Sequence, residues 1–117
     1  MNKSITNPHK DTLQLYSVSE LNTLVQSLLE TRIGTILVRG EISNLATPNS
    51  GHIYFSLKDE KSQIRCAMFR NKRGAIEFEP KNGVEVLATG LASLYTLRGD
   101  YQLIVDSIEL SGDGILR

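Results

Sequence analysis

The chain has 117 residues, which fits one domain with one modest core. It contains 13 Lys or Arg and 13 Asp or Glu, so a formal net charge of zero provides no overall attraction to nucleic acid. The only cysteine, Cys66, excludes an intramolecular disulfide, and no apolar run approaches the roughly 20 residues of a membrane span. We therefore expect a cytoplasmic protein that does not contact a membrane.

The N-terminal region is predicted to contain an arm followed by one helix. Residues 1–14 show no sustained period and are expected to form a mobile arm. Ser17 and Glu20 have the spacing of a capping box, which predicts a helix beginning here, and Gly34 is a plausible stop. Apolar residues recur at helical spacing: Val18, Leu21, Val25, Leu28 and Leu29. We expect this stripe to face the core, with contact to a partner helix as the alternative.

The rest of the sequence indicates strands. Alternating or β-rich runs occupy residues 35–42, 52–58, 64–69, 84–95 and 101–110. Loops are expected at 44–51 and 59–62, and a short helix or turn at 74–78. Five strands with an irregular element between the third and fourth predict an all-β, five-stranded Greek-key barrel of the OB type, with the N-terminal helix covering one open end. Bends are expected at Gly40 and Gly90, and an open five-stranded sheet with two helices is the alternative.

The sequence offers no convergent set of catalytic groups. His9, His52 and Cys66 lack the paired spacing of metal ligands. Cys66 shares its strand face with Ile64 and Met68, which predicts a thiol in the core. We expect no catalytic residue, no metal and no cofactor in this chain.

A binding surface is the better prediction. OB barrels bind ligands across the second and third strands, where outward residues here are expected to be aromatic or basic. Residues 58–73 contain six basic and two acidic residues, net +4. The candidate nucleic-acid-binding residues are Arg39, Tyr54, Lys58, Arg65, Phe69 and Arg70. As alternatives, Phe69 caps the barrel and Tyr54 packs against the helix, while His52 forms a structural hydrogen bond in its loop.

Three motifs resemble one known family. The runs G-E-I-S-N (40–44), S-G-H-x-Y-F-x-L-K-D (50–59) and C-x-M-F (66–69) resemble the large subunit of exodeoxyribonuclease VII, over residues 15–117. The resemblance independently implies an OB domain, here residues 15–110, that holds single-stranded DNA. It also implies that residues 111–117 are a flexible exit toward a catalytic domain absent from this chain.

In that family, a large subunit and several small subunits together degrade single-stranded DNA to oligonucleotides. The resemblance implies that small subunits bind through regions absent here and that this fragment is itself non-catalytic. Two other hypotheses stay open. The barrel could bind protein and orient other domains or subunits, or it could be an intrinsic nuclease that cleaves DNA with a divalent metal.

Overall fold

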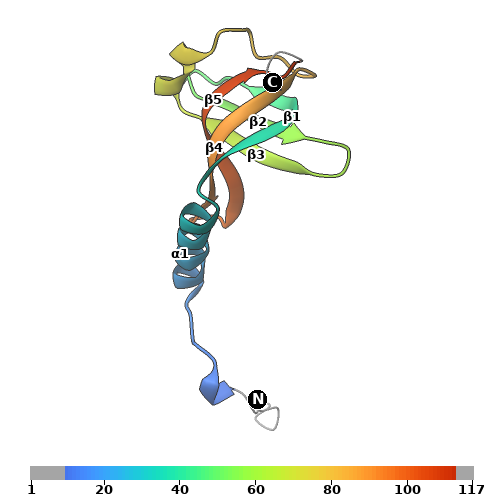
Figure 1. Ribbon diagram of the computed structural model, residues 1–117. Helices are drawn as coiled ribbons and strands as arrows, with labels where there is room; N and C mark the ends of the chain where they lie inside the picture. The colour runs from blue at the N-terminus through green and yellow to red at the C-terminus, as the bar shows by residue number, and fades with distance from the viewer. Residues whose placement is uncertain (1–9, 113–117) are drawn as a thin grey trace.

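Five strands form a closed barrel in the computed structural model, which describes residues 10–112 (Figure 1). The strands are β1 (Thr35–Ala46), β2 (Ile53–Lys58), β3 (Gln63–Met68), β4 (Glu85–Tyr95) and β5 (Asp100–Leu110). The helical elements are η1 (Lys10–Thr12), α1 (Val18–Leu28), η2 (Leu29–Ile33) and η3 (Arg70–Ala75). Residues 1–9 of the predicted arm and 113–117 of the predicted exit lie outside the described part of the chain.

The order of strands around the barrel, β1-β2-β3-β5-β4, confirms the predicted OB topology. The alternative of an open sheet is wrong, because β3 and β5 pair in parallel and close the ring. β1 is long enough to pair with two different strands along its length. Residues 35–41 pair with β4, and residues 41–46 pair with β2. Gly40 lies at this changeover, where an added Cβ would stand 3.1 Å from the Cβ of Leu57. Gly90 lies at an irregularity of the β4–β5 ladder, as predicted.

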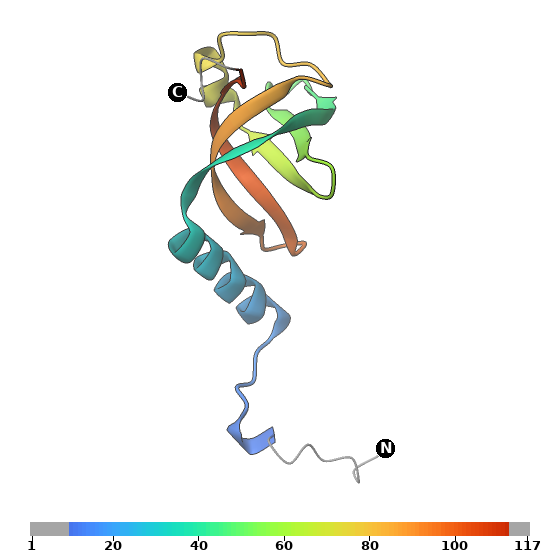
Figure 2. The same cartoon turned by 45° about the vertical axis from the view of Figure 1, so that its right-hand side comes forward.

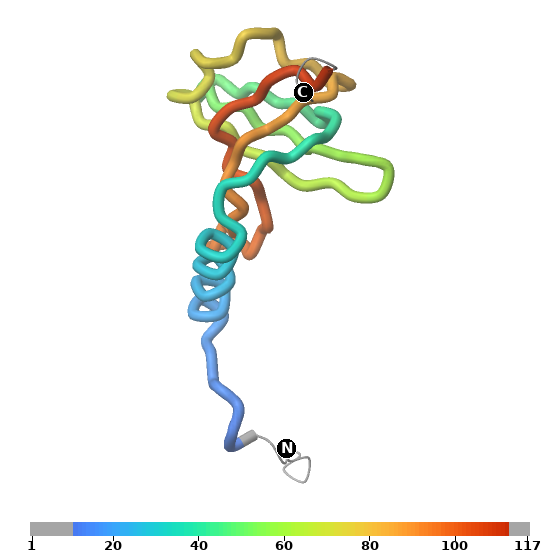
Figure 3. Tube along the Cα trace, in the orientation of Figure 1, coloured from blue at the N-terminus to red at the C-terminus, as the bar shows by residue number. Residues whose placement is uncertain are grey.

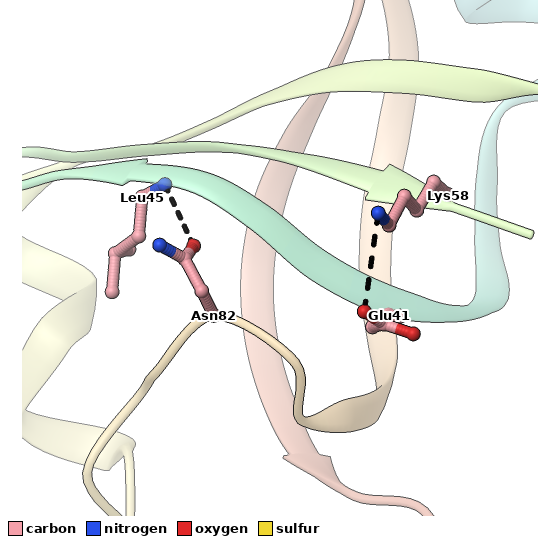
Figure 4. Close-up of polar contacts among 4 residues, drawn as sticks. All are labelled: Glu41, Leu45, Lys58 and Asn82. Atoms are coloured by element: carbon pink, nitrogen blue, oxygen red, sulfur yellow. Dashed lines mark hydrogen bonds and ion pairs between the residues drawn. The ribbon is translucent and has the colours of Figure 1, made fainter.

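Alternate side chains of the strands fill the barrel. The fully buried members with the largest side chains are Ile42, Ile53, Met68, Leu103, Val86 and Val105. Cys66 lies among them, so the predicted core thiol is confirmed. One end of the barrel is plugged by Leu45 and by Ile76, Phe78 and Val84, which pack against the core from the segment between η3 and β4. The Leu45 N–H donates to the side chain of Asn82 over 3.0 Å and ties this segment to β1 (Figure 4).

The prediction that the N-terminal helix covers an open end of the barrel is wrong. α1 extends away from the barrel beside the far end of the β4–β5 hairpin (Figures 1 and 2), and none of its residues is buried. The trace in Figure 3 shows residues 10–17 continuing in the same direction. The uncovered end of the barrel holds an open groove of about 270 Å³, whose lining includes Ile36, Ile64 and Tyr101.

The helix contacts β4 instead, with Val25 and Leu29 of the predicted stripe half-buried and with several polar side chains hydrogen-bonded to the hairpin. The Asn22 side chain donates to the Thr96 carbonyl over 3.0 Å, and the Gln26 side chain donates to the Leu94 carbonyl over 3.2 Å. The Ser93 hydroxyl donates to the Glu30 carboxylate over 2.6 Å. The helix therefore covers the hydrogen-bonding edge of β4, which would otherwise be unpaired. The predicted capping box of Ser17 and Glu20 is confirmed, with both reciprocal hydrogen bonds present.

Two predicted segment boundaries are wrong. β1 continues to Ala46, into the predicted loop 44–51, and Asn44 supports this extension with a positive φ of 52° beside a register shift. The short helix predicted at 74–78 begins earlier, as η3 from Arg70 to Ala75, because Ile76 and Phe78 are used to plug the barrel.

The predicted turn at 59–62 is confirmed: the Asp59 carboxylate accepts from two backbone N–H groups, which lowers the pKa of Asp59. Across residues 10–112, no helix is long and apolar enough to cross a membrane.

Candidate nucleic-acid interface

The outward face of the β2–β3 hairpin follows directly from strand alternation and register. Tyr54 pairs with Ala67, Ser56 with Arg65, and Lys58 with Gln63. Ser56 and Ala67 are small and buried, whereas Tyr54, Lys58 and Arg65 are exposed around them. The hairpin therefore presents a shallow surface of small side chains, flanked by the aromatic ring of Tyr54 and the cationic side chains of Lys58 and Arg65. Six residues of extended strand span about 20 Å, enough for several nucleotides.

Aromatic rings gather where β2 begins and β3 ends. The ring of His52 is 5.4 Å from the ring of Phe69 and 6.3 Å from the ring of Tyr54, both in edge-to-face orientation. The backbone N–H of Arg70 donates to His52 Nδ1 over 2.9 Å. This hydrogen bond joins the loop before β2 to the residue after Phe69. It therefore holds the His52 ring beside the Phe69 ring. We name His52, Tyr54 and Phe69 the aromatic cluster.

Both alternatives weighed for these rings are disfavoured by their positions. Phe69 lies outside the hydrophobic core, with 43% of its surface exposed. Tyr54 belongs to β2, whereas α1 packs against β4. Both rings are therefore partly exposed to solvent, and the structural hydrogen bond expected of His52 is present.

Two arginines stand beside the aromatic cluster at the start of η3. The side chain of Arg70 runs along Gly51, where an added Cβ would lie 2.7 Å from Arg70 Cδ. The Arg73 guanidinium donates to the Gly51 carbonyl over 3.0 Å. Neither forms an ion pair within the described residues. Lys72 differs, since its ammonium is 2.7 Å from the Asp106 carboxylate.

Sequence reasoning did not select Arg73 as a site residue. It was counted only as part of the basic segment, and its contact with a loop 22 residues earlier depends on the β2–β3 register. The clue available in the sequence was the glycine at position 51, which leaves room for the Arg70 side chain that follows β3 at the same end of the hairpin.

The other end of the hairpin, at the β2–β3 turn, attracts anions less strongly. Lys58 Nζ lies 4.0 Å from the Glu41 carboxylate on β1 (Figure 4), and Asp59 and Glu60 follow in the turn. Arg39 on β1 pairs with β4 and lines the groove at the open end, away from the aromatic cluster. Of the six predicted residues, the structure thus gathers Tyr54, Phe69 and Arg70 at one end. It puts Arg65 at the centre, without an ion pair among the described residues, and Lys58 and Arg39 at the other end.

Neither a metal-binding cluster nor a reactive thiol is found among residues 10–112. No cluster of three His, Cys, Asp or Glu side chains within residues 10–112 could hold a metal ion. Burial raises the pKa of Cys66 to about 12, which keeps the thiol protonated and unreactive. The chemistry offered by this surface is stacking, hydrogen bonding and attraction of anions.

These features define a nucleic-acid-binding barrel, and the sequence comparisons agree. The profile of the OB-fold nucleic acid binding domain family matches residues 16–109, and the chain belongs to this family. The chain is 53% identical over 104 residues to the Exodeoxyribonuclease 7 large subunit of Histophilus somni, and 52% identical over 103 residues to that of Edwardsiella ictaluri. These alignments cover 88–89% of this chain and 22–23% of the relatives, so the chain spans about a quarter of their length.

Solved structures share the fold at low sequence identity. A replication protein A heterotrimer bound to ssDNA superposes with a TM-score of 0.56 at 15% identity, covering 70% of this chain and 61% of that one. The S. pombe Stn1-ten1 complex superposes with a TM-score of 0.53 at 21% identity, covering 69% of this chain and 60% of that one. At such identities the likeness supports the OB fold alone.

Proposed function

We propose that this barrel binds single-stranded DNA for an exodeoxyribonuclease VII large subunit acting in the cytoplasm. The aromatic cluster beside Arg70 and Arg73 carries the proposal. Every base has a π-face, so exposed rings bind single strands with little dependence on sequence. The neighbouring guanidinium groups would pair with phosphates, which strengthens binding at low salt.

The arrangement suggests a direction for the bound strand along the hairpin. One or two bases would stack on Phe69 and Tyr54, and the backbone would then pass over the small residues Ser56 and Ala67 toward Arg65. Because Lys58 is paired with Glu41, the attraction for phosphate is expected to decline toward the β2–β3 turn. Binding is therefore expected to be strongest at the end near η3.

The wider activity belongs to the same proposal. The chain would present single-stranded DNA to a catalytic domain elsewhere in the large subunit, and small subunits would bind regions outside these residues. The similarity to Exodeoxyribonuclease 7 large subunits over almost the whole chain supports this role. In this scheme the barrel itself contributes affinity and positioning, without cleaving DNA.

A fluorescence titration with single-stranded oligonucleotide at about 50 and 200 mM salt tests DNA binding. The wild-type chain should bind more tightly at the lower salt, with micromolar or weaker affinity because its net charge is zero. Arg65→Ala should weaken binding. Arg98→Ala is the matched control, since it removes the same charge from the β4–β5 turn beside α1.

The two variants and the salt series give a clear decision. Salt-independent binding would contradict the electrostatic component. Equal weakening by Arg65→Ala and Arg98→Ala would show that only total charge matters, and the proposed interface would then be wrong.

A further inference from the structure

The imidazole of His52 has one nitrogen that the protein uses and one that stays free. Nδ1 accepts the backbone N–H of Arg70 over 2.9 Å. Nε2 has no hydrogen-bond partner among the described residues, although His52 is half-buried. Within residues 10–112, Ser43 Oγ is the one buried side-chain nitrogen or oxygen that lacks a partner. Nε2 of His52 is therefore accessible to solvent.

The hydrogen bond at Nδ1 also determines which nitrogen of His52 carries the proton. A neutral imidazole has one N–H donor and one acceptor nitrogen. Because Nδ1 is the acceptor for Arg70, the proton of the neutral ring lies on Nε2. The fold thus holds His52 as an uncharged N–H donor that points away from the Arg70 backbone and toward solvent.

The surroundings of this donor suit an anion beside stacked bases. The His52 ring lies 5.4 Å from the Phe69 ring and 6.3 Å from the Tyr54 ring. Next to His52, Gly51 is in contact with the side chain of Arg70, and its carbonyl accepts from the Arg73 guanidinium over 3.0 Å. One neutral donor and two cations therefore gather where the two rings meet. Phosphate oxygens accept readily from such a mixed set of donors.

We propose that His52 Nε2–H donates a hydrogen bond to a phosphate of the bound single strand. The acceptor is the phosphate that links the two nucleotides whose bases stack on Tyr54 and Phe69, because the His52 ring contacts both of those rings. This inference rests on the proposed DNA-binding function and adds a contact that carries no charge. His52 then has two separable roles, since Nδ1 holds the loop to Arg70 and Nε2 holds the DNA.

Asparagine and glutamine at position 52 separate the two roles. Asparagine has an oxygen near the place of Nδ1, so it keeps the acceptor for Arg70 but lacks the outer donor. Glutamine has an amide N–H near the place of Nε2 but lacks the inner acceptor. His52→Asn should therefore be the more stable variant in urea melts, whereas His52→Gln should bind DNA more tightly. A purely structural role predicts the same order in both measurements.

Titrations with a single-stranded oligothymidylate of about ten nucleotides give the size of the effect. His52→Asn should bind roughly 5- to 30-fold more weakly than the wild type, as for the loss of one hydrogen bond. The salt slope should stay unchanged, because no charge is removed.

Oligothymidylates with a single neutral methylphosphonate linkage identify the acceptor. At the contacted linkage, this replacement should weaken binding of the wild type more than binding of His52→Asn, because the two changes remove the same interaction. Additive losses at every linkage would overturn the phosphate contact.

Nitrogen-15 spectra of the wild-type imidazoles report on the atom itself, and His52→Asn identifies which signals belong to His52. The free protein should show a protonated Nε2 and an unprotonated Nδ1, and the oligothymidylate should shift the Nε2 signal. If the wild type binds DNA, an unshifted Nε2 signal overturns this inference alone, as does a His52→Gln variant that binds no more tightly than His52→Asn. A wild-type chain that binds no oligothymidylate at about 50 mM salt refutes the proposed function, and this inference with it.

Discussion

Phe69→Ala tests the central element of the proposed interface, because phenylalanine can contribute only stacking or packing. The ring is 43% exposed and meets His52 edge-to-face at 5.4 Å. Removing it takes away one stacking surface without changing any charge. We therefore expect weaker binding of single-stranded DNA with an unchanged salt slope.

The structure sets the expected size of both effects. Loss of one base stack costs about 1–3 kcal/mol, which corresponds to a roughly 5- to 150-fold increase in Kd. Replacing a fully buried phenylalanine by alanine costs about 3–5 kcal/mol of stability. Since a little more than half of the Phe69 surface is covered, about 2 kcal/mol is expected here, which leaves the domain folded.

Fluorescence anisotropy with a labelled oligonucleotide gives the binding loss, and urea denaturation gives the stability loss. Tyr16→Ala serves as the matched control, because Tyr16 is a similarly exposed aromatic, at 40%, that precedes α1 and lies away from the barrel. The control should bind DNA like the wild type. If Phe69→Ala strongly lowers stability while the folded fraction still binds DNA normally, the ring is structural and the assigned interface is wrong.

Four further outcomes are expected. In salt titrations of DNA binding, Arg65→Ala should lower the salt slope by about 0.7, the value for one phosphate contact on a single strand. Lys58→Ala should change the salt slope less, because Lys58 is already paired with Glu41. His52→Phe should lose about 1 kcal/mol of stability in urea melts, since it lacks the acceptor for a backbone N–H, while His52→Asn can retain this bond and should lose less. Gly90→Ala should cost about 1–3 kcal/mol, because the new Cβ would stand 2.8 Å from a β5 carbonyl; a variant that melts like the wild type would contradict the rigid packing inferred there. Magnesium should not induce cleavage of labelled single-stranded DNA by the isolated chain, and shortened product that co-purifies with the folded domain would show that a nuclease site was missed.

The strands and turns could be predicted because their signals are local. Ile53, Phe55 and Leu57 alternate with polar residues, and one-sided burial of a strand requires that period. The turn after β2 needs only Asp59, whose carboxylate accepts from the backbone two and three residues later. The capping box likewise involves residues three apart. In each case the interacting groups lie within one turn or one strand.

The candidate interface could be predicted only in part. Alternation determined that Tyr54, Arg65 and Phe69 point outward from the hairpin. It did not determine which cations would remain unpaired. Lys58 meets Glu41 only because β1 lies beside β2 in one particular register, and Arg73 reaches a loop 22 residues earlier. The uneven charge along the face therefore arises from contacts between strands.

The sequence alone determined the strands, the turns, the outward parity of the β2–β3 hairpin and the beginning of the helix, because these depend on neighbours along the chain. Only the tertiary structure decided where α1 lies. Its apolar stripe suggested a core position, but polar side chains of the helix donate to the carbonyl groups of Leu94 and Thr96, which lie 68 and 74 residues later in the chain than their donors. Those carbonyls exist as acceptors only after β4 and β5 have formed a hairpin that extends beyond the barrel. A periodic pattern identifies the two faces of a helix, whereas the choice between them depends on which partners the completed fold leaves unpaired.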